Sequence, residues 1–244
     1  MTQKYSSGQA ALEALNRKDD GGGKFASFKS GSSYRVRVLG TIDLMVFRSY
    51  GIFNEINSFV ADNPSQYNAK GYPVADLTPW DKASEYYSKL AFEAEGDKAK
   101  QDELRQEARK YRGKERFAMG FIDLETGEPI IIDLSKKQAA AVHATILKNE
   151  SKLNKKAFEI EKTGTGQATA VIFSPLDLDD LSGAELKNFE KYDGEQFNHE
   201  AFTGILYEAD EAEQVELLVK AGFDVSLIGL DKPKEKTDTP ADDF

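Results

Sequence analysis

The sequence contains no cysteine and only two histidines among its 244 residues. The absence of cysteine excludes disulfides, thiol nucleophiles and cysteine-ligated zinc, and is typical of a reducing compartment. His143 and His199 are far apart in the sequence, so the side chains most often used for nucleophilic or zinc-dependent catalysis are scarce. No long apolar run or export leader is apparent, which favours a cytoplasmic protein. We therefore expect a protein that is not an enzyme and needs no cofactor or metal.

Carboxylates are the remaining candidates for chemistry. Asp177, Asp179 and Asp180 could hold Mg²⁺ or Ca²⁺, but their spacing lacks the glycine and the distal glutamate of an EF-hand loop. The glycines at Gly21-Gly22-Gly23 are not followed by the Lys-Ser/Thr pair of a phosphate-binding loop. A Mg²⁺-dependent nuclease is thus the least favoured of the functions that the sequence leaves open.

The net charge of −10 is distributed unevenly along the chain. Residues 1–120 carry 19 basic and 16 acidic side chains, a net charge of +3. Residues 177–244 carry six basic and 19 acidic side chains, a net charge of −13. Because the local field rather than the overall charge attracts a polyanion, the first half remains a candidate surface for nucleic acid.

A period of two indicates short strands in the front half. Tyr34, Val36 and Val38 alternate with Arg35 and Arg37, and two more strands are expected at residues 44–50 and 56–60. Two hairpins are predicted at 116–134 and 157–174, separated by a helix over 136–148 in which Ser135 and Gln138 form a capping box. A second capping box joins Ser182 to Glu185. This order suits a small, partly open Greek-key barrel of the OB-fold type.

The expected fold class is therefore mainly β with α insertions (α+β), namely an OB-fold barrel with a helical insertion and C-terminal helices. We expect four regions: a helical and linker segment at 1–31, the OB-fold core at 32–176 with its insertion at 61–113, an acidic helical extension packed on the core at 177–230, and a disordered acidic tail at 231–244.

The concave face of an OB-fold binds single strands through cations for phosphate and aromatic rings for bases. The strands and the basic segment 105–116 supply both kinds of side chain. Each aromatic residue could instead belong to the core, and for Trp80 the core and a base-stacking role are equally favoured. The arginines of the first strand could simply form a solvent-exposed strand face. The candidate DNA-binding residues are Arg35, Arg37, Arg48, Tyr50, Phe53, Phe59, Trp80, Arg109, Arg112, Lys114 and Arg116.

Three stretches carry a family resemblance: Tyr34 to Gly40, Arg116 to Leu124 and Gly204 to Asp210. Over roughly residues 24–230 the chain resembles phage single-stranded-DNA-binding proteins, the helix-destabilising proteins of phage replication. The resemblance implies an OB-fold, sequence-independent binding of single-stranded DNA in replication, recombination and repair, a place in the host cytoplasm, and possible self-association.

Several members of that family hold zinc in the insertion. This chain has neither cysteine nor histidine between residues 61 and 113, so we expect that metal to be absent. In its place, we expect a small apolar cluster to hold the insertion together, formed by Trp80, Tyr86, Tyr87 and Phe92.

The tail from Asp231 to Phe244 carries five acids, three lysines and two prolines. Asp242, Asp243 and Phe244 combine carboxylates with a ring, which a basic pocket with an apolar floor could bind. We expect them to recruit replication or recombination proteins and to compete with DNA for the cationic groove. The alternative is an acidic protein-interaction module that binds basic partners and never binds DNA.

Overall fold

One large sheet organises the part of the chain that the computed structural model describes, residues 25–232. Its strands run in the order β10-β3-β2-β6-β1-β8-β9, and β7 pairs with β6 outside this path. The strands are β1 (Ser33–Arg37), β2 (Leu44–Ile52), β3 (Ile56–Ala61), β6 (Lys114–Asp123), β7 (Pro129–Ser135), β8 (Lys156–Thr163), β9 (Ala170–Asp177) and β10 (Glu208–Ala209). A separate small sheet pairs β4 (Gln66–Tyr67) with β5 (Pro73–Ala75).

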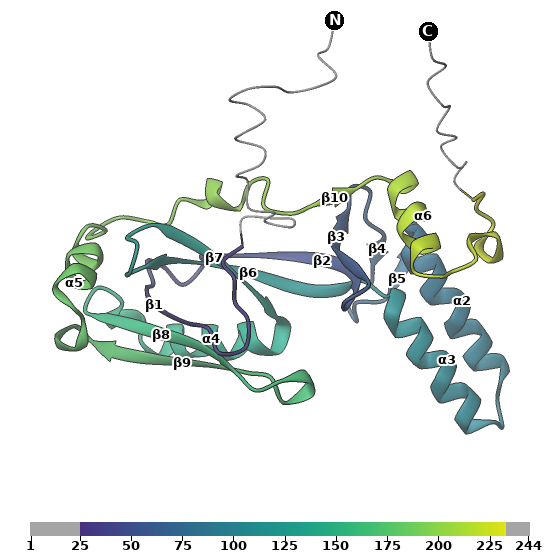
Figure 1. Cartoon of the computed structure of the whole chain (residues 1–244), viewed down its shortest axis with the longest axis horizontal. Helices are drawn as coiled ribbons and strands as arrows, with labels where there is room; N and C mark the ends of the chain where they lie inside the picture. The colour runs from purple at the N-terminus through teal and green to yellow at the C-terminus, as the bar shows by residue number, and fades with distance from the viewer. Residues whose placement is uncertain (1–24, 233–244) are drawn as a thin grey trace, which may run out of the picture.

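The large sheet does not close on itself within residues 25–232, so the arrangement is a mixed α/β fold around an open sheet. All its strand pairs are antiparallel except that of β10 with β3. In Figure 1 the long strands β2 and β6 extend from the larger part of the sheet toward the helices at the right of the view.

Five α-helices surround this sheet in the described residues: α2 (Pro79–Glu93), α3 (Lys98–Tyr111), α4 (Lys136–Lys148), α5 (Gly183–Glu190) and α6 (Glu211–Lys220). The predicted capping boxes are confirmed at α4, where Ser135 and Gln138 satisfy each other's backbone N–H, and at α5, where Ser182 and Glu185 do the same. Thr78 caps α2, and Pro79 follows it at the first helical position, where its missing N–H costs nothing.

The alternation of β1 positions the first core. Val36 is fully buried, and Val38, just past the strand, is buried beside it; both pack with Val142 and Ile146 of α4. The predicted apolar face of β1 is therefore confirmed. Helix α4 covers this side of the sheet, between the two hairpins that flank it in sequence (Figure 1).

A second core joins β2 and β3 to α2, α3 and α6. Trp80 is fully buried at its centre, and its indole Nε1 donates to the backbone oxygen of Gln214, 3.1 Å away. Tyr86 and Tyr87 pack against this core as expected, but Phe92 is 78% exposed, so its predicted place in the cluster is wrong. Phe92 instead borders a surface hollow between α2 and α3.

A buried carboxylate also holds the insertion in place. Asp81 Oδ2 accepts hydrogen bonds from the hydroxyls of Tyr50, Ser65 and Tyr67. Burial and the nearby Asp81 charge raise the pKa of the Tyr50 hydroxyl well above its ordinary value. Burial, followed by the hydrogen bond to Asp81, raises the pKa of Tyr67 to about 12. This network connects strand β2 to the helical insertion through polar contacts.

Candidate nucleic-acid interface

One face of β2 and β6 forms the floor of a groove. Phe47 lies directly opposite Arg116, and Ser49 lies opposite Lys114. Residues opposite each other in an antiparallel pair point to the same face of the sheet, so these four side chains share one surface. The sheet thereby places two cations beside an aromatic ring and a hydroxyl.

Two adjoining hollows make this groove continuous. One has a volume of about 260 Å³ and the other about 380 Å³. Ser49, Ser58, Arg116 and Asp133 border both, so the hollows meet at these four residues. We call the combined feature the β2–β6 groove, and the four shared residues its waist.

The two ends of the β2–β6 groove have different linings. At one end Lys162 of β8 donates to the Phe28 carbonyl, 2.9 Å away. At the other end, Phe53 and Asn54 in the β2–β3 turn lie with Lys114 at the start of β6. Along one side runs the segment 205–207, which is held because Val60 donates its backbone N–H to the Tyr207 carbonyl, 2.9 Å away.

The charge of the groove is opposite in sign to that of the whole chain. Its lining contains three cations, Lys114, Arg116 and Lys162, and one acid, Asp133. Arg116 Nε and Nη2 donate to the two Asp133 carboxylate oxygens at 2.8 and 2.7 Å. Burial, followed by the positive charge of Arg116, lowers the pKa of Lys162. A phosphate placed beside Lys162 would relieve this destabilisation of the ammonium.

Aromatic rings are also accessible along the groove. Phe25 and Phe47 are half-buried, and their rings stack with centroids 6.1 Å apart. Phe53 is 89% exposed, and Tyr207 is 45% exposed. Such rings offer faces on which unpaired bases can stack.

Four of the predicted site residues are buried and belong to the protein interior. The structure therefore corrects the prediction for Arg37, Tyr50, Phe59 and Trp80, each of which is 3% exposed or less. The rings of Tyr50, Phe59 and Trp80 pack on one another, with centroids 5.2 to 6.2 Å apart. Tyr50 and Phe59 border the two hollows of the groove, but with 3% or less of each residue exposed their rings pack in the second core instead of facing a base.

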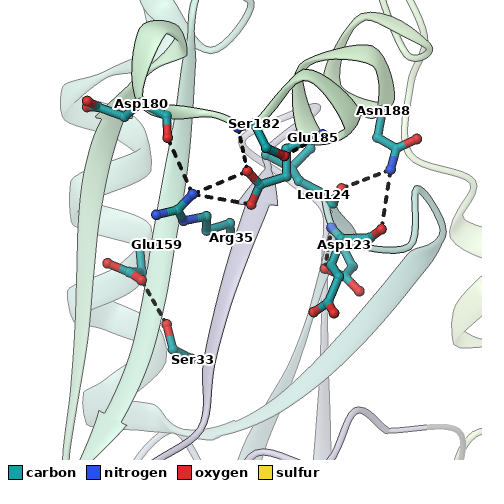
Figure 2. Close-up of polar contacts among 10 residues, drawn as sticks. Ser33, Arg35, Asp123, Leu124, Glu159, Asp180, Ser182, Glu185 and Asn188 are labelled. Atoms are coloured by element: carbon teal, nitrogen blue, oxygen red, sulfur yellow. Dashed lines mark hydrogen bonds and ion pairs between the residues drawn. The ribbon is translucent and has the colours of Figure 1, made fainter.

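The two arginines of β1 hold the acidic extension to the sheet. Arg37 donates to the Phe189 carbonyl and to Asp193, and its guanidinium carbon lies 4.1 Å from the centroid of the Phe189 ring. Figure 2 shows Arg35 pointing to Glu185 at the start of α5, with Nη1–Oε2 at 3.2 Å, and to the Asp180 carbonyl. The Ser182 backbone N–H is the main reason that the pKa of Glu185 is lowered, and Arg35 adds to the effect. Neither arginine lines the β2–β6 groove.

The other predicted residues in the described range lie in three places. Phe53, Lys114 and Arg116 line the β2–β6 groove. Arg48 lies on the opposite face of β2, where its guanidinium carbon is 3.7 Å from the centroid of the Tyr67 ring. Arg109 and Arg112 border a separate hollow between α2 and α3. Asp242, Asp243 and Phe244 lie outside the described residues.

Among the cations and accessible rings of the groove, four were not predicted from the sequence: Phe25, Phe47, Lys162 and Tyr207. The alternation in β2 predicts that Phe47 lies on the face of the sheet opposite to Arg48 and Tyr50. It does not show which of these two faces the insertion covers. Lys162 and Tyr207 are distant in sequence from β2, and only the pairing of β1 with β8 and of β10 with β3 brings them to the groove.

No protein-family model matches this chain, and the comparisons found neither a curated protein nor a solved structure similar to it. Among residues 25–232, no group of three or more His, Cys, Asp or Glu side chains is placed to hold a metal ion. No helix in that range has both the length and the apolar character needed to cross a membrane.

Proposed function

We propose that this protein binds single-stranded DNA, without reading its sequence, in the β2–β6 groove. The observation that carries the proposal is the lining of the groove: three cations against one acid in a chain of net charge −10, together with accessible rings. A role in DNA replication, recombination or repair, inside a phage-infected cell, follows from the sequence resemblance.

The binding mechanism combines charge with stacking. Lys114 and Lys162 bind no acid among residues 25–232, so the ends of the groove attract phosphates, while Asp133 compensates Arg116 at the waist. When lysines and arginines of the protein displace the counterions condensed on the DNA phosphates, the resulting affinity does not depend on the base sequence. Stacking on Phe53, Tyr207 or the Phe25–Phe47 pair adds about 1–3 kcal/mol per base. Because duplex DNA hides its base faces, this mechanism favours single strands.

We further propose that the open sheet is an elaborated OB-fold. Its support is the order of elements: strands β1 to β3, the β6–β7 hairpin, helix α4 and the β8–β9 hairpin. The central strand β6 pairs with β1, β2 and β7, as expected for a meander that curls without closing fully.

The acidic segment 231–244 has a proposed role beside the groove. Asp242, Asp243 and Phe244 would recruit replication or recombination proteins, and the segment's carboxylates would compete with phosphates for the same cations. Removal of residues 231–244 should then tighten DNA binding at low salt. An unchanged affinity would remove the competition from the proposal.

The direct test is fluorescence anisotropy of labelled oligothymidylate, with duplex of matched length as the control. We expect preferential binding of the single strand, weakened by salt with a log–log slope of about −0.7 per phosphate contact. Lys114→Glu should weaken binding, whereas Lys155→Glu, at an exposed loop position outside the groove, should not.

Other results would overturn the proposal. Absence of binding at low salt would favour an acidic protein-interaction module. Cleavage of the oligonucleotide in the presence of Mg²⁺ would instead indicate a nuclease.

A further inference from the structure

The helical insertion carries a second cationic and aromatic surface. Arg105 and Arg109 are four residues apart and share one face of α3, and Arg112, the C-cap residue just past the end of the helix, borders the same hollow between α2 and α3. Tyr72 and Phe92 flank this face, 49% and 78% exposed. We call these five residues the α3 arginine face.

The α3 arginine face surrounds a hollow of about 540 Å³ between α2 and α3. Small side chains, Ala91 of α2 and Ala108 of α3, lie buried between the two helices and border this hollow. The Arg112 guanidinium carbon lies 5.2 Å from the centroid of the Tyr72 ring. Two acids are nearby: Glu95 borders the hollow, and Asp102 lies 3.5 Å from Arg105, with both side chains of that pair more than half exposed. An exposed ion pair of this kind contributes little energy, so a phosphate can replace Asp102 as the partner of Arg105.

A single glycine connects this surface to the β2–β6 groove. Arg112 belongs to the α3 arginine face and Lys114 to the end of the groove, with Gly113 between them. Arg48 Nη1 donates to the Gly113 carbonyl, 3.1 Å away. A Cβ at residue 113 would come within 2.9 Å of the Arg48 and Tyr50 side chains. The connection is therefore tightly packed, which fixes the two cations on either side of it.

We propose that a single strand long enough to leave the groove at Lys114 continues past Gly113 onto the α3 arginine face. The inference rests on the proposed function and extends it: the helical insertion is the second half of the nucleic-acid site. The cations then follow the order Lys162, Arg116, Lys114, Arg112, Arg109 and Arg105 from one end to the other. Tyr72 and Phe92 offer rings for bases in the second half, as Phe53 and Tyr207 do in the first.

Continuity favours this occupant over an acidic peptide. A peptide partner would need only an isolated basic surface, whereas this surface begins at Arg112, which only Gly113 separates from Lys114 at the end of the groove. Arginines spaced along α3 rise about 1.5 Å per residue along the helix axis, so they present a row of charges rather than a single pocket. A row of charges suits a polyanion that extends along it.

The test compares oligothymidylates of two lengths: the shortest that wild-type protein binds and one twice as long. Arg105→Glu with Arg109→Glu reverses two charges on the α3 arginine face. Lys98→Glu with Lys100→Glu makes the same charge change at exposed positions near the start of α3, outside the hollow. Circular dichroism and a melting curve establish that both double variants are folded.

For the arginine double variant we expect unchanged affinity for the short oligomer and weaker binding of the long one. Its salt-dependence slope for the long oligomer should be about 1.4 smaller in magnitude, since two phosphate contacts are lost. The lysine double variant should match wild type at both lengths.

Equal losses for the two oligomers, equal losses for the two double variants, or no loss at all would overturn the inference. If the arginine double variant bound every oligomer normally but lost a synthetic peptide of residues 231–244, the face would belong to acidic peptides. Failure of wild-type protein to bind any oligomer would overturn the proposed function, and this extension with it.

Discussion

Arg116 and Asp133 form a two-pronged ion pair across neighbouring strands, at the point where the two hollows of the groove meet. Their side chains are 30% and 34% exposed, so the pair faces the groove while remaining partly shielded from solvent. The pair cancels one positive charge at the centre of an otherwise cationic surface. Under the proposed function, Asp133 therefore limits the affinity of the groove for a polyanion.

Asp133→Asn should tighten single-strand binding, because it frees the Arg116 charge for a phosphate. The gain should reach about 1 kcal/mol, and the salt-dependence slope should steepen by about 0.7. Asp177→Asn is the matched control, since it also releases a paired cation, Lys156, but away from the groove. Anisotropy titrations over a range of salt concentrations measure both quantities, and equal gains for the two variants would contradict the prediction.

Phe53→Ala should weaken binding of single strands by about 1–3 kcal/mol, because the exposed ring at the groove end stacks on a base. Stability should change by less than about 0.5 kcal/mol, since the side chain is 89% exposed and packs on little. Ile42→Ala removes another exposed apolar side chain, 72% exposed, that does not line the groove. A similar loss for Ile42→Ala would show that Phe53 has no special contact with DNA.

Single-strand binding should also weaken as pH rises toward the ordinary lysine pKa of about 10.4. Burial and the Arg116 charge lower the pKa of Lys162, so this ammonium loses its proton, and its attraction for phosphate, before an exposed lysine does. Lys162→Arg keeps the charge throughout, and its affinity should decline less over the same pH range. Superimposable pH profiles for wild type and Lys162→Arg would indicate that no phosphate lies beside residue 162.

The buried tyrosines predict a loss of stability in alkali. An unfolded tyrosine ionises at about pH 10, whereas the folded state raises the pKa of Tyr67 and of Tyr111 to about 12 and that of Tyr50 further. For such raised values the stabilisation is complete below the unfolded pKa and is lost as pH rises through the folded one. Urea midpoints measured from neutral to alkaline pH should therefore decrease above about pH 10.

Tyr67→Phe tests the source of this effect. The variant should lose about 1–3 kcal/mol at neutral pH, because Asp81 loses one hydroxyl donor. Its stability should then fall less steeply with rising pH, since one ionisation has been removed. A curve parallel to that of wild type would show that Tyr67 does not contribute to the alkaline transition.

Local sequence patterns predicted the elements well, because the forces that define them act between near neighbours. The alternation around Val36 and Val38 and the capping residues Ser135 and Ser182 gave the strand phase and the helix starts that the structure shows. The expected partly open barrel is not confirmed, because the sheet of residues 25–232 stays open and its curvature depends on pairings among strands that lie far apart in the sequence.

The candidate site was predicted only in part, for the same physical reason. The alternation in β2 shows that Phe47 and Arg48 point to opposite faces of the sheet. Which of the two faces is covered depends on a segment that is distant in sequence. Arg35 donates a hydrogen bond to Glu185, which lies 150 positions later in the sequence, and no local pattern predicts such a contact. Phe53, Lys114 and Arg116 line the groove, and the first two lie at a turn and at a strand end, positions that stay near the surface whatever packs elsewhere.

The indole-to-carbonyl bond from Trp80 to Gln214 makes the helical insertion and the C-terminal extension depend on each other for their stability. Shortening the chain ahead of α6 would remove Val215 and Leu218 from beside the indole and open the second core to water. Any fragment meant to isolate the β2–β6 groove must therefore retain the sequence through Leu230, because the segment that forms one side of the groove leads directly into α6.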